Sequence, residues 1–368
     1  MNFPVKQIFV DQAVASLPET LRLTEGAVVP VEVIDDVKAL YGILMNTPDP
    51  VEAGKKILFL TKNKGAFIKK CPGTKYYNCC GYMILHVGTF CHMDCSYCIL
   101  QSYFHPPVLQ YFVNRQEMLA ELQEEFQKGK IQRIGTGEFT DSLIWEPFSK
   151  ITEELVPRFA AQSTAVLELK TKTVEIQNLH QYDHNRKTIL AWSLNTPRII
   201  HSEERNTTSL GERLAAAKTC EAMGYPLAFH FDPIVLYEGC EAEYREVIET
   251  LFSAVSPDSI VWISLGTFRF MPDLKSIVQK RFSESKIPYG EFITGLDNKM
   301  RYFKPLRMAF YRKMVQWIRE AAPRVLIYYC MEDDEVWSKT MGFTPAEKGG
   351  LPAMLDRSAM DHCGLDVL

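Results

Sequence analysis

The chain has 368 residues, of which 46% are hydrophobic and 23% charged, a composition typical of a globular protein with a sizeable core. Its 41 basic and 45 acidic residues give a formal net charge of −4, which excludes a protein that is basic throughout, as many nucleic-acid-binding proteins are. No apolar run approaches the roughly 20 residues of a membrane-spanning helix, and the first residues lack a signal-peptide pattern, so we expect a cytoplasmic protein without membrane contacts.

Residues 1–76 are predicted to form a small N-terminal unit. Two short apolar segments, VVPVEVI and KILFL, are followed by a stretch rich in lysine. The lysines are Lys55, Lys56, Lys62, Lys64, Lys69, Lys70 and Lys75. Such a run is most often a solvated face, and the alternative is a surface that binds phosphates.

Residues 77–270 alternate between strand-like and helix-like segments. The strand candidates are residues 82–87, 131–135, 165–169, 188–194, 226–231 and 259–265. Helical periodicity occurs between them, at 117–129, 209–224 and 243–255. The second helix has a capping box signature, Ser209 followed by Glu212, and a closing Gly224. This alternation predicts an α/β fold in which a parallel sheet curls into an open partial (βα)6 barrel.

Residues 271–368 are predicted to form a C-terminal extension. It contains a long helix near residues 300–320 and a further strand candidate at 325–331. The segment KMRYFKPLRMAFYRK interleaves basic and aromatic residues. Cations that hold phosphates beside aromatic rings that stack bases would suit a nucleic acid, whereas the same pattern suits an amphipathic helix that covers the sheet.

Three cysteines follow the first predicted strand of the barrel: Cys91, Cys95 and Cys98. Three thiolates within eight residues can hold an iron–sulfur cluster and leave its fourth iron open for a small molecule. The alternatives are a zinc site with His86, His92 or Cys80 as the fourth ligand, and free thiols. The aromatic ring of Tyr97 could shield one side of a cluster.

The run CHMDCSYC resembles the CxxxCxΦC signature of the radical S-adenosylmethionine superfamily, where Φ is aromatic. This resemblance implies a [4Fe-4S] cluster at Cys91, Cys95 and Cys98, with S-adenosylmethionine on the unique iron. It also implies reductive cleavage of S-adenosylmethionine to a 5′-deoxyadenosyl radical, which abstracts hydrogen from the substrate. The electron would come from an external donor of the flavodoxin or ferredoxin type.

Residues that follow the other predicted strands are candidates for the cofactor site, because functional groups gather at the carboxyl ends of parallel strands. The segment GTGEF is similar to the superfamily's glycine-rich motif, in which Gly135, Gly137 and Glu138 would meet the amino group of S-adenosylmethionine. In LKTKT, Lys172 is favoured over Lys170 as a partner of the methionine carboxylate. Ser193 and Asn195 could bond the ribose or the carboxylate, or simply cap a turn.

The last two strands of the barrel add candidate catalytic residues. His230 and Asp232 alternate with Phe229 and Phe231, so one face of that strand becomes polar, although a buried histidine with satisfied hydrogen bonds would look the same. Arg269 follows the sixth strand. The catalytic candidates are therefore Glu138, Tyr97, His230, Asp232 and Arg269.

Several segments are similar to the spore photoproduct lyase family: CSYC-x-LQ (95–101), FVN (112–114), GYPLAFHFDPI (224–234) and SLGTFRF (264–270). This resemblance implies a thymine–thymine lesion in DNA as the substrate. In that family a cysteine after the second strand and a tyrosine after the third cluster cysteine relay a hydrogen atom. The corresponding residues here are Glu138 and Ile99, so Cys79, Cys80 or Cys330 would have to replace the thiol.

The sequence thus indicates a radical enzyme with a DNA lesion as one possible substrate. A radical enzyme with a non-DNA substrate, a noncatalytic iron–sulfur protein that binds nucleic acid, and an electron carrier remain as alternatives. The glycine-rich motif favours a bound ligand, which counts against the last two.

Overall fold

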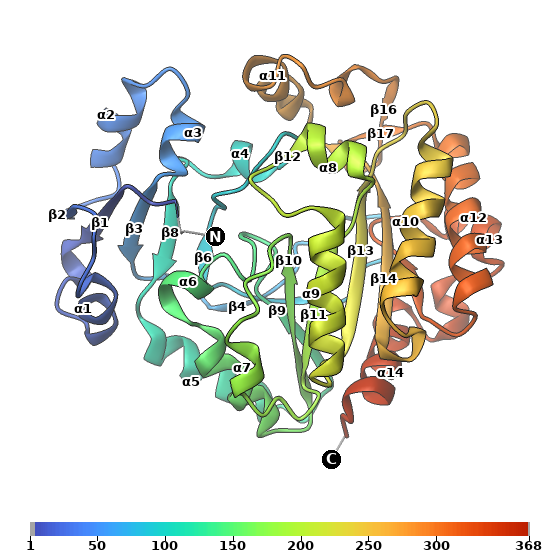
Figure 1. Cartoon of the computed structure of the whole chain (residues 1–368), viewed down its shortest axis with the longest axis horizontal. Helices are drawn as coiled ribbons and strands as arrows, with labels where there is room; N and C mark the ends of the chain where they lie inside the picture. Colours follow the sequence, from blue (N-terminus) through green and yellow to red (C-terminus); the bar gives the residue numbers. More distant parts are fainter. Residues whose placement is uncertain (1–3, 367–368) are drawn as a thin grey trace.

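The computed structural model describes residues 4–366 and contains two main sheets. The first has the strand order β2-β1-β3-β8-β6 and lies at the left of Figure 1. Its strands are β1 (Gln7–Asp11), β2 (Val31–Ile34), β3 (Ile57–Thr61), β8 (Leu109–Phe112) and β6 (Gly88–Thr89). The first four are parallel, and β6 is antiparallel to β8. The short helices α1 (Pro18–Thr24), α2 (Ala39–Met45) and α3 (Pro50–Gly54) connect β1 to β2 and β2 to β3.

The second sheet is the curled half-barrel that the sequence predicts, with eight strands in the order β18-β14-β13-β11-β10-β9-β5-β4. Its strands are β4 (Ile68–Lys70), β5 (Met83–Leu85), β9 (Gln132–Gly135), β10 (Ala165–Thr171), β11 (Thr188–Ser193), β13 (Leu227–Ile234), β14 (Ile260–Thr267) and β18 (Ile327–Tyr329). All run parallel from β5 to β18, and β4 is antiparallel to β5. The α/β fold class and the six predicted strands are confirmed, and β4 and β18 extend the sheet beyond six.

Helices cover the outer face of this sheet, as right-handed crossovers require (Figure 1). They include α5 (Arg115–Phe126), α7 (Thr152–Ala160), α9 (Leu210–Ala222), α10 (Cys240–Ala254), α13 (Asp334–Met341) and α14 (Leu351–Cys363). The predicted capping box of α9 is present: Ser209 accepts a hydrogen bond from the Glu212 amide, and the Glu212 carboxylate accepts one from the Ser209 amide. No helix of the described residues is long and apolar enough to cross a bilayer.

The long helix predicted near residues 300–320 begins later than expected. It is α12 (Lys304–Ala321), because Met300–Tyr302 forms β17, which pairs with both β15 (Arg269–Phe270) and β16 (Phe292–Thr294). The helical period of the basic and aromatic residues therefore applies only after residue 303.

Strands are exchanged across residue 76, so the two sheets do not divide the chain there. The first sheet takes β6 and β8 from the later sequence, and the half-barrel takes β4 from the earlier. The segment 71–82 then crosses to the opposite edge of the half-barrel, where the Asn78 amide donates to the Glu332 carbonyl at 3.0 Å. The division into residues 1–76, 77–270 and 271–368 stays a prediction.

Candidate functional site

The three-cysteine loop lies between the two sheets and is pinned through its backbone. The Gln101 amide nitrogen donates to the carbonyls of Cys95, Ser96 and Cys98 at 3.0–3.2 Å. The buried ammonium of Lys55 donates to the Cys91 carbonyl at 3.0 Å and also to the Met93 carbonyl. The Met93 backbone amide donates a hydrogen bond to the Cys91 sulfur.

Two of the three thiols, those of Cys91 and Cys95, are buried, and that of Cys98 is half-buried. Burial raises the pKa of Cys91 to about 12 and raises that of Cys95 as well, and the neighbouring Cys98 adds to both shifts. Cys91 also raises the pKa of Cys95. No three ligating side chains among residues 4–366 already surround a single metal position. Three thiols on one pinned loop nevertheless fit an iron–sulfur cluster, whose binding would displace the thiol protons.

Tyr97 is fixed beside this loop by a network of charges. Its hydroxyl donates to Glu204, and Arg213 forms an ion pair with Glu204 at 2.6 Å. Burial alone would raise the pKa of Glu204, but Lys172, Arg213 and Tyr97 together hold it below the ordinary value. The Lys172 ammonium lies 5.7 Å from the centre of the Tyr97 ring. The tyrosine is therefore a rigid wall of the site, as expected of a residue that shields a cluster.

The two glycines of GTGEF are required by neighbouring side chains. A Cβ atom on Gly135 would lie 1.6 Å from the Tyr82 hydroxyl, and one on Gly137 would lie 3.0 Å from the Lys170 Cβ. The chain can therefore turn tightly after β9 and bring Glu138 to the lumen of the half-barrel. The glycines give the turn its shape, and direct contact with a cofactor stays a prediction.

Glu138 belongs to a charged group in the lumen together with Lys170, Asp232, Arg269 and Cys330. Arg269 forms two bonds with the Asp232 carboxylate, at 2.9 and 3.1 Å, and also donates to the Thr267 carbonyl at 3.3 Å and to the Cys330 sulfur at 3.4 Å. Burial would lower the pKa of Lys170, but Glu138, Glu168 and Asp232 hold it above the ordinary value. Lys170 thus faces the lumen, whereas Lys172 faces the cysteine loop.

His230 and Asn195 are held by the protein itself. The ring nitrogens of His230 bond Ser264 Oγ at 2.6 Å and Glu168 Oε1 at 2.8 Å. The Asn195 amide donates to the Pro233 carbonyl at 2.9 Å and accepts from the Tyr244 hydroxyl at 2.7 Å. The Ser193 carbonyl accepts a hydrogen bond from the Arg213 side chain at 2.8 Å. These contacts favour positioning roles for His230 and Asn195. The sequence analysis had this interpretation as its alternative: a buried histidine with satisfied hydrogen bonds, and a residue that caps a turn.

Asp141 is a buried residue of the site that sequence reasoning missed. Its carboxylate accepts from the Thr171 hydroxyl and the Lys172 amide, both at 2.8 Å, and from the Leu143 amide at 3.0 Å. It therefore ties the loop after β9 to the end of β10 and fixes where Lys172 lies. In the sequence, the only indication that Asp141 belongs to the site is its position three residues after Glu138.

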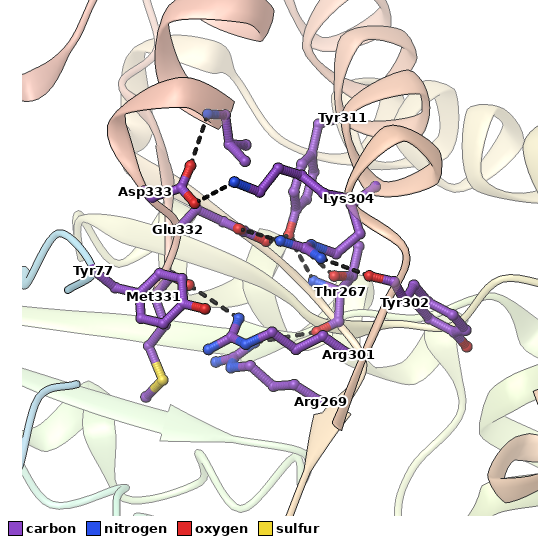
Figure 2. Close-up of polar contacts among 12 residues, drawn as sticks. Tyr77, Thr267, Arg269, Arg301, Tyr302, Lys304, Tyr311, Met331, Glu332 and Asp333 are labelled. Atoms are coloured by element: carbon purple, nitrogen blue, oxygen red, sulfur yellow. Dashed lines mark hydrogen bonds and ion pairs between the residues drawn. The ribbon is translucent and has the colours of Figure 1, made fainter. Parts of the chain in front are cut away.

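The basic and aromatic segment 299–313 is partly buried. Arg301 pairs with Asp297 at 2.6 Å and donates to the Met331 carbonyl at 3.1 Å, and Figure 2 shows Arg301 beside Met331. Arg307 makes a two-pronged pair with Glu332, at 3.0 Å for both contacts, and the Tyr311 hydroxyl also donates to Glu332. The segment's two fully buried arginines are therefore used inside the protein, which supports the helix reading over a nucleic-acid surface.

Replacing Arg307 with methionine should destabilise the protein by about 3–5 kcal/mol, because the Glu332 carboxylate would remain buried without its cation. Urea unfolding monitored by tryptophan fluorescence measures this. The matched control is Arg312→Met on the exposed side of α12, which should change the free energy of unfolding by less than about 1 kcal/mol. An Arg307→Met change within that same range would contradict the assigned role of the pair.

A curled parallel half-barrel with a three-cysteine loop at its mouth is the architecture of the radical S-adenosylmethionine proteins. Within this class, the model of the spore photoproduct lyase family matches residues 76–313, more than half of the chain. The chain belongs to this family.

Named relatives are spore photoproduct lyases. The protein of Clostridium acetobutylicum is 27% identical over 223 residues, which is 60% of this chain and 64% of that protein. The protein of Bacillus subtilis strain 168 is 26% identical over 209 residues, 55% of this chain and 61% of the relative. The match thus spans less than two thirds of the length of each relative.

Solved spore photoproduct lyases share the fold. A double mutant with bound AdoMet and dinucleoside spore photoproduct superposes with a TM-score of 0.80 at 21% identity, covering 88% of this chain and 98% of that one. A complex with dinucleoside spore photoproduct gives 0.81 at 20% identity, covering 89% and 100%.

Proposed function

We propose that the protein is a radical enzyme that holds a [4Fe-4S] cluster at Cys91, Cys95 and Cys98 and reductively cleaves S-adenosylmethionine. The observation that carries this proposal is the presence of three cysteines, two buried and one half-buried, on a single loop pinned by Gln101 and Lys55. The cluster would supply the electron that breaks the carbon–sulfur bond of S-adenosylmethionine. Its own electron would come from a small flavodoxin or ferredoxin type donor in the cytoplasm.

The cofactor would lie between the cysteine loop and the lumen. We propose that Glu138, with the turn at Gly135 and Gly137, receives its amino group, and that Lys172 pairs with its carboxylate. Lys172 is supported by its position beside Tyr97 and Cys95. Ser193 would add a polar contact, and Asn195 would act by holding the end of β11 in place.

The substrate is proposed to be a DNA pyrimidine lesion of the spore photoproduct type. Support comes from the family, and from relatives whose structures contain dinucleoside spore photoproduct. The lesion would enter the lumen, where Asp232 and Arg269 are paired near Glu138. A lesion within a duplex would have to leave the base stack to reach that depth.

The proposed reaction also needs a residue that donates a hydrogen atom to the product radical. Of the three spare thiols, Cys330 has the best-supported position, since its sulfur contacts Arg269 and its pKa responds to Asp232 and Glu138. Cys79 and Cys80 lie on the crossing segment 71–82 as free thiols, and their side chains share a hydrogen bond. The carboxylate at 138 and Ile99 in place of a phenol also favour a second candidate, a radical enzyme of this family with a different substrate.

Anaerobic incubation of reconstituted protein with dithionite and S-adenosylmethionine tests the first step. We expect 5′-deoxyadenosine and methionine in equal amounts, measured by chromatography, because homolysis of one bond yields both. Adding a lesion-containing oligonucleotide should raise the rate if the lumen accepts DNA, and undamaged DNA is the control. Intact S-adenosylmethionine with a fully loaded cluster would refute the proposal.

A further inference from the structure

The N-terminal sheet has a cavity at the carboxyl ends of its parallel strands, and all of its lining residues except Gln110 and Phe112 precede the family match at residues 76–313. Its volume is about 540 Å³, and its lining comes from residues at or near the ends of four strands. These residues are Asp11 at the end of β1 and Ala13 after it, Asp35, Asp36 and Val37 after β2, Phe59, Thr61, Lys62, Asn63 and Lys64 around the end of β3, and Gln110 and Phe112 on β8. A volume of roughly 300–1,000 Å³ is typical of a small-molecule site.

The topology of the sheet predicts a site at the same place. From β1 the chain passes to β2 on one side, and from there it crosses to β3 on the other side of β1. The sheet order therefore reverses between β1 and β3. In open parallel sheets, ligands bind in the crevice outside the carboxyl ends of the strands at such a reversal. Cavity and topology are two separate observations that agree.

The wall at the centre of the crevice is preorganised. The Asp11 carboxylate, at the end of β1, accepts from the Ala13 amide and from the Thr61 hydroxyl at the end of β3, both at 2.9 Å. The following loop is held by Asn63, whose side chain bonds the carbonyls of Gly65 and Ala66 at 2.9 and 3.2 Å. Asn114 supports the same loop through the Asn63 amide at 2.9 Å. The crevice therefore keeps its shape without a ligand.

Unpaired charges of both signs face this crevice. Lys62 and Lys64 are exposed, and neither forms an ion pair with any residue of the described range 4–366. Asp35 and Asp36 are also exposed, and the Asp36 carboxylate accepts a hydrogen bond from the Lys38 amide at 2.9 Å. The two lysines follow β3 and the two aspartates follow β2, so the positive and the negative charges lie at the ends of different strands.

We propose that this crevice binds a ribonucleotide. Its phosphate would pair with Lys62 and Lys64, and the vicinal hydroxyls of its ribose would donate to Asp35 and Asp36. An acidic residue at the end of the second strand is how doubly wound sheets bind the ribose diol. A bare anion would leave the two carboxylates as repulsive neighbours, and a metal ion would be repelled by the lysines. The site does not depend on the proposed radical chemistry.

Isothermal titration of the full chain with ribonucleoside monophosphates tests this proposal. The protein should be reconstituted and saturated with S-adenosylmethionine, so that the half-barrel cannot capture the nucleotide. We expect one nucleotide per chain with a Kd of about 1 mM or tighter for at least one of the four bases. The 2′-deoxy form of that nucleotide should bind at least tenfold more weakly, and inorganic phosphate more weakly still.

Two double variants locate the site. We expect nucleotide binding to weaken at least tenfold in the double variant Lys62→Ala/Lys64→Ala, and likewise in Asp35→Asn/Asp36→Asn. The control is Lys69→Ala/Lys70→Ala on β4, which should bind the nucleotide like the unmodified chain. All six positions are exposed, so thermal unfolding should be unchanged. The proposal is overturned if no ribonucleotide binds, if inorganic phosphate binds as tightly as the nucleotide, or if either cavity variant binds like the unmodified chain.

Discussion

A Cys95→Ala variant, reconstituted anaerobically, is expected to hold no [4Fe-4S] cluster and to leave S-adenosylmethionine intact. Cys95 is buried, it lies on the same loop as Cys91 and Cys98, and its carbonyl accepts a hydrogen bond from the Gln101 side chain. Two remaining thiolates cannot hold a cubane whose fourth iron is reserved for the cofactor. Iron and sulfide analysis should fall from about four of each per chain to below about one.

The matched control is Cys220→Ala, which removes a buried cysteine of α9 away from the loop. It should keep its iron, its sulfide and the cleavage of S-adenosylmethionine. Loss of the cluster in both variants would indicate general destabilisation. A full cluster in Cys95→Ala, or stoichiometric zinc in place of iron in the unmodified protein, would show that the three-cysteine loop has another role.

The second large effect concerns repair of the lesion. We expect the unmodified protein to form 5′-deoxyadenosine at least tenfold faster than it forms repaired thymidylyl-thymidine from dinucleoside spore photoproduct, a difference of about 1.4 kcal/mol in activation free energy. By its resemblance to the family, the chain has Glu138 at the position of the relay thiol, and a carboxylate has no weak S–H bond to give. The Glu138→Cys variant should bring the two rates together when S-adenosylmethionine is saturating, which offsets the loss of the carboxylate proposed to receive its amino group. Both products are separated by chromatography.

Glu138→Gln is the control for the second prediction, because it removes the charge without adding a thiol. It should remain as slow in repair as the unmodified protein. Clean repair by the unmodified chain would contradict the prediction. The Cys330→Ala variant would then decide whether the thiol beside Arg269 is the donor, and repair in D₂O would show the transferred atom as one deuterium in the product.

The course of the half-barrel could be predicted because its strands are buried apolar runs separated by helical patterns with clear caps. The curl, the strand order and the capping box of α9 follow from local periodicity and crossover handedness. The start of α12 could not be predicted, because Met300–Tyr302 becomes a strand only through its partners β15 and β16, which are distant in sequence. The exchange of β4, β6 and β8 between sheets is equally nonlocal.

For the site, spacing alone located the cysteine loop, because metal ligands close in sequence leave a strong pattern. Spacing could not separate Lys170 from Lys172, since both lie at the end of β10 and only their neighbours in the fold distinguish them. Spacing also could not predict that Arg301 and Arg307 are buried, because their burial depends on ion pairs with Asp297 and Glu332. Residues whose role depends on a tertiary partner are thus where sequence reasoning fails.

Lys55 lies just before β3 of the first sheet, and its charge would affect the reduction potential of a bound cluster. Its ammonium lies 3.5 Å from Asp94 Oδ1 and donates to carbonyls on both sides of His92. A [4Fe-4S] cluster becomes more negative when it is reduced, so a buried ammonium nearby favours the reduced form and shifts the midpoint potential upward. A fragment that began at residue 77 would lose this charge, and its cluster would demand a stronger reductant.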